Sequence, residues 1–273
     1  MASKLDLIRV LQETSRTFAI PIGRLPTPLQ QAVAPAYLCM RALDEIEDHP
    51  GLGNQEKATL LQNISRTLQA HIGVLSPSRI LAELEITLTP YWQHLPEVSR
   101  RLGDWLANAP TGISARILDA TAAMADRMAF WAGKEWSIQS EADLHGYTFS
   151  VAGSVGLLLC DIWAWFDHTE LDRIAAVQFG RGLQVVNIIR NRPEDLERGA
   201  DYFPRGWSRE DMIGYARRTL GMVKASAESM PVQAYKYLVE IPLLLADATL
   251  DAIENGQAKV SRTKVLQIIA QVS

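Results

Sequence analysis

The feature that most constrains this chain is a helical hydrophobic pattern that runs along nearly its whole length. Apolar side chains recur every three or four residues, which places them on one face of an α-helix, and no convincing period-two strand or Asn-Gly hairpin interrupts the pattern. The pattern therefore predicts an all-α protein. Its clearest helical segments are Leu29–Glu47, Gln55–Leu75, Thr111–Gly133, Glu141–Trp165 and Leu171–Arg190.

Turn-forming residues separate these segments, and polar residues stand where helices are expected to begin. Thr27 precedes Pro28, and Ser140 and Ser208 each precede a further helical segment. Hydroxyl side chains at such positions accept hydrogen bonds from the first free N–H groups of a helix. No linker rich in Gly, Ser or Pro divides the chain, and no internal repeat is visible. We predict one domain, residues 1–273, of about ten helices.

The composition argues against several classes of protein. The net charge of −4 does not suit a nucleic-acid-binding protein, because such proteins usually carry a basic face. Cys39 and Cys160 are too few for a disulfide framework or a zinc site. The N-terminus shows no secretory signal, and there is no uninterrupted run of about 18 apolar residues that would predict a transmembrane helix. We expect a cytoplasmic protein.

An acidic cluster ends the segment that reads YLCMRALDEIED. Asp44 and Asp48 are one helical turn apart near a helix C-terminus, where like charge and the helix dipole both disfavour them. Magnesium prefers carboxylate oxygens and leaves coordination positions for phosphate oxygens. The pair is therefore interpreted either as a metal–diphosphate site or as a solvated acidic helix end. Helical spacing places on one face Tyr37, Arg41, Asp44 and Asp48, with Glu47 at the margin.

A second polar cluster lies about 150 residues further along the chain, in the sequence QVVNIIRNRPEDLERGADYFP. Buried amide side chains need hydrogen-bond partners, so amides within this apolar stretch suggest a site. Arg190 could bind a phosphate or form a surface ion pair. The candidate side chains of the cluster are Gln184, Asn187 and Asn191 on one face, followed by Glu194 and Asp195.

Small residues are concentrated between Tyr147 and Gly156, in the sequence YTFSVAGSVG. Each glycine lowers helix propensity by about 1 kcal/mol relative to alanine, so a second purpose is expected. Two compatible interpretations are close packing of two helices and space left for a long apolar ligand. Two interpretations also apply to the tryptophans, which either pack in the core or line a cavity with aromatic rings. Examples are Trp131, Trp136, Trp163 and Trp165.

Taken in order, these motifs resemble the squalene/phytoene synthase family, and its squalene synthases more than its other members. The likeness spans nearly the whole chain, and NIIR with a following acidic motif, downstream of RALDxxED, is a specific combination. The motifs are SRTF at Ser15–Phe18, YLCMRALDEIED at Tyr37–Asp48, YTFSVAG at Tyr147–Gly153, NIIRNRPED at Asn187–Asp195, YFP at Tyr202–Pro204 and GQAKVSRTK at Gly256–Lys264.

The resemblance implies an all-α, single-domain isoprenoid synthase fold with two acidic motifs facing each other across a central cavity. It implies that Mg²⁺ binds the diphosphates of two farnesyl-type substrates, which are condensed through presqualene diphosphate to squalene with hydride from NADPH. The implied metal ligands are Asp44, Asp48 and an assisting Glu47, with Asn191, Glu194 and Asp195 in the second motif. Tyr147, Arg41, Asp44 and Asp48 would be catalytic. Substrate contacts would come from Arg16, Tyr37, Arg41, Gln184, Asn187 and Arg190, and nicotinamide contacts from Lys259 and Arg262.

Three positions depart from the family pattern. Asn191 stands where the second motif normally begins with aspartate, and Pro193 lies inside that motif. Ala200 stands where the family usually has an arginine, and Arg198, two residues earlier, could take the place of that arginine. A proline removes an N–H donor and clashes with the preceding turn, so we expect the helix to kink or end near Arg192.

Three hypotheses follow from these departures. The chain is a complete squalene-type synthase, a relative that hydrolyses or cyclises one farnesyl-type diphosphate, or a non-catalytic isoprenoid-binding protein. In each case only peripheral membrane contact is expected.

Overall fold

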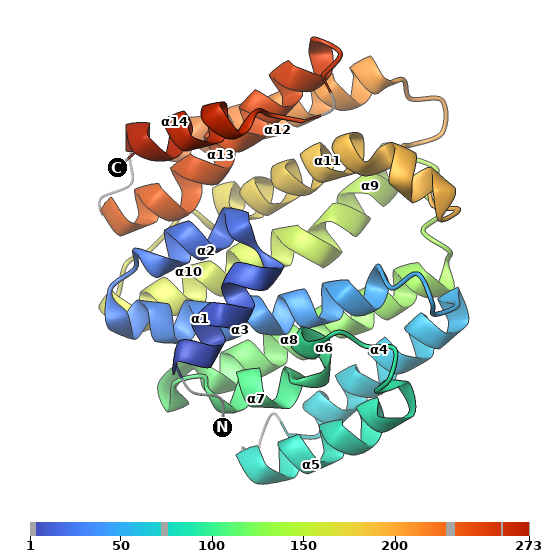
Figure 1. The fold of residues 1–273 in the computed structure, drawn as a ribbon, viewed down its shortest axis with the longest axis vertical. Coiled ribbons are helices and arrows are strands. Elements are labelled where there is room, and N and C mark those ends of the chain that lie inside the picture. The colour runs from blue at the N-terminus through green and yellow to red at the C-terminus, as the bar shows by residue number, and fades with distance from the viewer. Residues whose placement is uncertain (1–3, 72–75, 228–232, 258, 273) are drawn as a thin grey trace. The chain divides into compact units, whose positions relative to one another are not determined.

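The computed structural model describes residues 4–71, 76–227, 233–257 and 259–272, and the regular elements in these ranges are all helices (Figure 1). The predicted all-α class is confirmed. The first nine elements are α1 Lys4–Thr14, α2 Arg16–Gly23, α3 Thr27–Glu47, α4 Asn54–Gln69, α5 Pro77–Leu88, η1 Thr89–Tyr91, α6 Glu97–Arg100, α7 Leu102–Ala107 and α8 Thr111–Gly133. The others are α9 Glu141–Thr148, the π-helix η2 Phe149–Gly153, α10 Ser154–Asp167, α11 Arg173–Glu197, α12 Arg209–Ala227, α13 Gln233–Glu254 and α14 Arg262–Val272.

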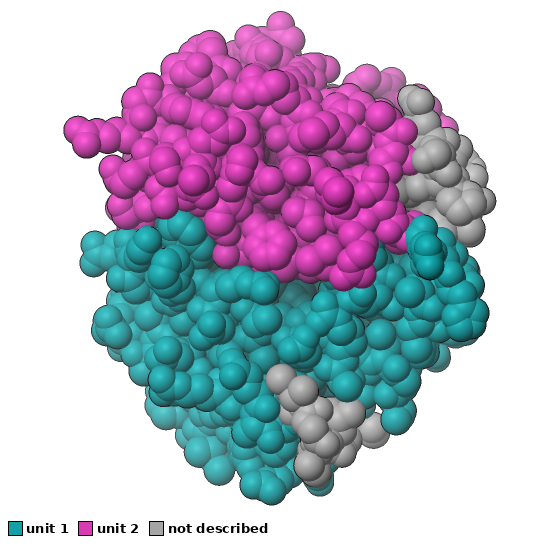
Figure 2. Space-filling view, turned by 180° about the vertical axis from the view of Figure 1, so that it is seen from behind, with its two compact units in different colours: residues 1–136, 158–170 teal, residues 137–157, 171–273 magenta. Residues whose placement is uncertain are grey.

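The chain divides into two compact units, coloured separately in Figure 2. Unit 1 consists of residues 1–136 and 158–170, and unit 2 of residues 137–157 and 171–273. Unit 1 holds the first acidic motif, and unit 2 holds Tyr147 and the second motif. The prediction of one domain over residues 1–273 stays a prediction.

Several expected boundaries are confirmed, and one expected cap is wrong. Helix α8 has the predicted bounds, and Ser140 accepts a hydrogen bond from Asp143 N while the Asp143 side chain accepts one from Ser140 N. Ser208 caps α12 in the same way, because its hydroxyl accepts from Asp211 N at 3.1 Å. Thr27 is instead the first residue of α3, and the extended Pro26 occupies the cap position without a side-chain hydrogen bond. Within the described residues the number of helices is larger than the ten expected, because short helices form before α3 and between α5 and α8.

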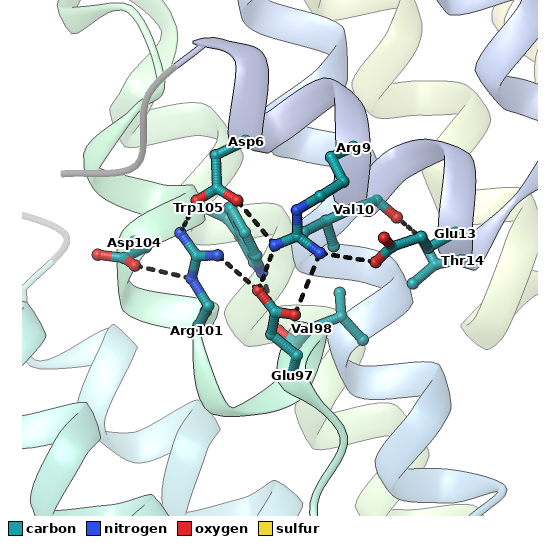
Figure 3. A network of polar contacts seen from close by, with 10 residues as sticks. All are labelled: Asp6, Arg9, Val10, Glu13, Thr14, Glu97, Val98, Arg101, Asp104 and Trp105. Atoms are coloured by element: carbon teal, nitrogen blue, oxygen red, sulfur yellow. Dashed lines mark hydrogen bonds and ion pairs between the residues drawn. The ribbon is translucent and has the colours of Figure 1, made fainter.

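An ion-pair network ties the N-terminal helix α1 to α6 and α7 within unit 1 (Figure 3). Arg9 on α1 reaches Glu97 at 2.7 Å, and Arg101 pairs with Asp6. The Arg101 guanidinium also lies 4.5 Å from the ring centroid of Trp105. Multiple partners for each arginine make this a network, which fixes α1 more firmly than an isolated surface pair would. Its charged members are Asp6, Arg9, Glu13, Glu97, Arg101 and Asp104.

Unit 2 is built on α11, which packs against α12, α13 and η2. Glycines allow close backbone approach at the contact with η2 and the start of α10. A Cβ atom on Gly180 would lie 2.2 Å from Ala152 O, and one on Gly156 would lie 2.1 Å from Ala176 O. The structure therefore confirms that the small residues of YTFSVAGSVG serve close helix packing.

The helical stretch Glu141–Asp167 is long and apolar enough to cross a membrane by length and composition alone. Of its most apolar window, 44% is buried inside the protein. Gly156 and the neighbouring π-helix pack on α11 within unit 2, which favours a core helix over a membrane span.

We expect Gly180→Ala and Gly156→Ala each to lower the free energy of unfolding by about 3 kcal/mol, because the new methyl group would overlap backbone atoms that cannot move aside. Urea denaturation measures the change. Gly221→Ala on α12 is the matched control, since no atom lies within 4 Å of its added Cβ. It should raise stability by about 0.5–1 kcal/mol through helix propensity. Equal stability of the three variants would contradict the packing argument.

A second prediction concerns the stability of the protein at low pH. Hydrogen bonds from Arg101 and Arg9 lower the pKa of Asp6 to about 2. The unfolded carboxyl titrates near its ordinary pKa of about 3.9, so the ionised form stabilises the fold above that pH and loses this effect as pH falls towards 2.

Asp6→Asn should therefore lower the unfolding temperature at pH 7, and its difference from the wild type should shrink between pH 4 and pH 2. Thermal unfolding of both proteins across that pH range measures the difference in unfolding temperature. At pH 7, 1 M salt should reduce this difference. A difference that does not change with pH would contradict the role of the Asp6 charge.

Candidate functional site

The first candidate motif lies on α3 in unit 1. Arg41 forms ion pairs with Asp44, one turn further along, and with Glu45. Its Nε is buried and has no hydrogen-bond partner. An unpaired buried donor on a guanidinium is costly, and an anionic oxygen bound there would satisfy it.

The negative charge of Asp48 acts on the neighbouring Asp44 carboxylate of this motif. Burial and the negative charge of Asp48 raise the pKa of Asp44 to about 7, against which the Arg41 charge acts. About a third of the Asp44 side chain stays exposed, and Asp48 is exposed at the end of α3. A site that disfavours ionised carboxylates is one that a bound cation would stabilise.

Glu47 points into unit 1, where it is 3% exposed. Its Oε1 accepts a hydrogen bond from the indole Nε1 of Trp136 at 2.8 Å. Burial and the Asp48 charge raise the pKa of Glu47 well above its ordinary value. Its role as a metal ligand stays a prediction.

The SRTF motif packs against the same helix. Ser15 caps α2 by accepting a hydrogen bond from Phe18 N, and the Phe18 ring lies 5.4 Å from the ring of Tyr37. Burial raises the pKa of Tyr37 to about 12, so its hydroxyl remains protonated at neutral pH. Arg16 begins α2, but its side chain lies outside the described residues. The motif therefore contributes packing for Tyr37.

The second candidate motif lies on α11 in unit 2. Gln184 and Asn187 are half-buried, as expected for amides in an apolar stretch. Arg190 is exposed, and its Nε donates to Asn191 Oδ1 at 3.0 Å. The neighbouring arginine thus engages the amide that stands where the family has aspartate.

The two acids that follow are placed differently from each other. Glu194 is exposed, whereas Asp195 is 5% exposed and forms an ion pair with Arg198. Arg198, which could have substituted for the arginine absent at Ala200, is therefore bound to Asp195. The structure gathers the predicted residues of this motif on one helix, and their metal-binding roles stay predictions.

Of the two effects expected of Pro193, an end of the helix near Arg192 is wrong, because α11 continues through Pro193 to Glu197. A kink at this position stays a prediction. The helix ends in a Schellman motif, in which Ala200 N donates to Asp195 O at 2.9 Å and Gly199 adopts a φ of +82°. This glycine-based cap satisfies the Asp195 and Leu196 carbonyl groups of the last turn.

Tyr147 contacts the YFP segment within unit 2. Its ring stacks on that of Tyr202, with centroids 4.8 Å apart and planes inclined by 21°. The segment is held by Asp201, which pairs with Arg192 at 2.9 Å, while the Arg192 guanidinium lies 3.8 Å from the ring centroid of Phe203. Two motifs far apart in the sequence thus meet at Tyr147, which is 3% exposed.

Two features of unit 2 were not predicted from the sequence. Tyr147 lies two residues before the π-helical turn η2, an irregularity frequent at functional sites. Arg181, 8% exposed, donates to the hydroxyl oxygens of Thr148 and Tyr215 and to Gln178 Oε1. The position of Arg181 between two glycines in an apolar stretch was a sequence signal that could have identified it. No sequence signal marks the π-helix.

The predicted nicotinamide contacts lie near the C-terminus. Lys259 and Arg262 are both exposed, and Arg262 is the first residue of α14. Their roles stay predictions.

The residues of unit 1 fit a magnesium–diphosphate group. Asp44 and Asp48 offer carboxylate oxygens one turn apart, and the unsatisfied Nε of Arg41 offers a donor to an anionic oxygen. Within the described ranges, no three His, Cys, Asp or Glu side chains form a ready metal cluster. A pair of carboxylates is nevertheless what Mg²⁺ commonly uses when substrate phosphates complete its coordination.

The all-helical fold, with an Arg–carboxylate motif on one helix and an amide–carboxylate motif on another, agrees with the isoprenoid synthase class that the sequence resemblance implies. The model of the family described as squalene/phytoene synthase matches residues 11–211, and the chain belongs to that family.

Curated relatives are similar over most of this chain. The squalene synthase of Schizosaccharomyces pombe is 26% identical over 305 residues, covering 96% of this chain and 63% of the relative. The Botryococcus squalene synthase of Botryococcus braunii is 29% identical, covering 89% of this chain and 51% of the relative. The human squalene synthase is 27% identical, covering 85% and 52%. The chain thus spans about half to two thirds of the length of these relatives.

A solved complex of TcSQS with the ligand BPH1237 has a similar fold. It superimposes with a TM-score of 0.74 at 20% sequence identity, covering 97% of this chain and 85% of the other. The isoprenoid synthase fold expected from the sequence is therefore confirmed.

We expect Asp44→Asn to raise the free energy of unfolding of the metal-free protein at pH 8 by about 1–2 kcal/mol, a value discounted for partial exposure. With a folded-state pKa near 7 and an ordinary unfolded value, the ionised carboxylate opposes folding, so the contribution of Asp44 to stability falls as pH rises from 4 to 8. Urea unfolding in the presence of a chelator measures the free energy of unfolding of both proteins. The two values should become equal below pH 4. A less stable variant at pH 8 would show that the ion pair with Arg41 outweighs the burial cost.

Proposed function

We propose that this chain is a Mg²⁺-dependent prenyltransferase that condenses two farnesyl diphosphates, through presqualene diphosphate, to squalene or a related C30 product. The observation that carries the proposal is the first motif, where two neighbouring carboxylates accompany an arginine with a buried, unsatisfied N–H. Family membership and the squalene synthases among the relatives support the substrate class.

The chemistry of such a site is electrostatic. Ionising an allylic diphosphate separates a carbocation from pyrophosphate, and bound Mg²⁺ supplies positive charge to the departing phosphate oxygens. Arg41 would donate its free Nε–H to the same oxygens, while Asp44 and Asp48 would hold the metal. Tyr147, buried against Tyr202, would lie in a water-poor environment suited to a carbocation. NADPH, with Lys259 and Arg262 as contacts, would supply hydride for the last step.

A second candidate is a relative that ionises one farnesyl-type diphosphate and then hydrolyses or cyclises it. The second motif favours this alternative, because Asn191 is neutral and bonded to Arg190, and Asp195 is held by Arg198. A weakened second motif would bind one diphosphate less firmly and so reduce coupling of two substrates.

The test is incubation of the purified protein with farnesyl diphosphate and Mg²⁺, with and without NADPH, followed by mass-spectrometric identification of products. We expect a C30 hydrocarbon with NADPH and presqualene diphosphate without it. Farnesol or a cyclic C15 product without any C30 species would establish the second candidate.

We expect Asp48→Asn to lower kcat/KM by about 100–1000-fold, since charge stabilisation by the metal site is lost. Asp119→Asn is the matched control, because Asp119 is an exposed carboxylate that pairs with Arg116 on α8. It should keep the wild-type rate. Asn191→Asp should increase the fraction of C30 product if the second motif is weakened. Activity retained in Asp48→Asn would contradict the assignment of the first motif.

A further inference from the structure

The backbone is unusual directly after α8. Two consecutive non-glycine residues, Glu135 and Trp136, adopt φ angles of +52° and +49°. The left-handed region is disfavoured for such residues, and for a bulky aromatic side chain it is a true outlier. Backbone hydrogen bonds from Glu135 N to Ala132 O and from Trp136 N to Trp131 O, both 3.0 Å, hold the turn. Glycine is the usual residue in this type of helix ending, so another interaction must favour the residues present.

That interaction is made by the Trp136 side chain. The indole ring is 6% exposed, and its Nε1 donates to Glu47 Oε1 on α3 at 2.8 Å. The Lys57 ammonium on α4, 7% exposed, lies 5.1 Å from the ring centroid. One indole therefore links an acidic residue of α3 with a basic residue of α4, inside unit 1.

We propose that Trp136 is a positioning residue for the first acidic motif, a proposal that rests on the proposed function. By holding the Glu47 carboxyl group inside unit 1, the indole N–H leaves Asp44 and Asp48 as the two carboxylates that bind Mg²⁺ with diphosphate. Glu47 then serves as an anchor for the end of α3 and not as a metal ligand.

The choice of tryptophan has a physical reason. Its N–H satisfies a carboxyl oxygen without introducing a charge, so it does not compete electrostatically with a cation bound nearby, as an arginine or lysine in its place would. Its ring face also accepts the Lys57 ammonium, which a smaller neutral donor such as serine cannot do. Contacts that orient metal-site residues in this way typically change metal affinity by 10–100-fold when they are removed.

The experiment measures Mg²⁺ binding separately from product formation. The unfolding temperature is recorded over a Mg²⁺ titration at fixed inorganic pyrophosphate, which gives a half-saturating Mg²⁺ concentration for each variant. Trp136→Phe keeps the ring but removes the N–H donor. Trp105→Phe is the matched control, since Trp105 is fully buried and its Nε1 donates to Val98 O at the same distance of 2.8 Å.

We expect Trp136→Phe to raise the half-saturating Mg²⁺ concentration by roughly tenfold or more. Trp105→Phe should lower the unfolding temperature without moving that concentration. Glu47→Gln retains an oxygen that can accept from the indole, and should raise the concentration much less than Asp48→Asn does. Equal Mg²⁺ binding by Trp136→Phe and the wild type would overturn the proposal, as would a Glu47→Gln loss as large as that of Asp48→Asn.

Different results would overturn the proposed function and the positioning role of Trp136. A wild-type protein that binds Mg²⁺ with pyrophosphate but forms no prenylated product would overturn the proposed function and leave the positioning role standing. A wild-type protein whose stability does not respond to Mg²⁺ and pyrophosphate would overturn the positioning role itself.

Discussion

Burial of charged groups inside helical units is the constraint on which the rest of this structure depends. A buried charge must be paired, accept or donate strong hydrogen bonds, or lose its charge. Glu47 meets the requirement with an indole N–H, Arg181 with the hydroxyls of Thr148 and Tyr215, and Asp195 with an ion pair to Arg198 on the following turn. These arrangements decide which polar side chains of each motif remain able to bind a ligand.

The two motifs consequently differ in what they can do. On α3, the carboxylates, Glu45 included, carry more negative charge than Arg41 can balance, and burial makes this costly. On α11, the corresponding charge is reduced by Asn191 and already neutralised at Asp195 by an arginine. The first motif is therefore the stronger candidate for the metal.

Much of the helical framework could be predicted from residue patterns alone. The bounds of α8 agree with the hydrophobic period, and Ser140 and Ser208 begin helices as their hydroxyls suggest. Two local expectations failed. α11 continues through Pro193 and ends in a cap at Gly199, beyond the point where the proline alone would have ended it. Similarly, Thr27 begins α3 itself because Pro26 takes the cap position.

The sequence by itself determined the all-α class, the family and the residues that share each helical face, because these depend on the fixed period of the helix and on motifs within short segments. Only the tertiary structure decided that Glu47 turns inward to Trp136 and that Tyr147 stacks on Tyr202. Those pairs are separated by many residues along the chain. Helical period gives the direction of a side chain relative to its own axis, whereas the partner that it meets depends on how the helices pack.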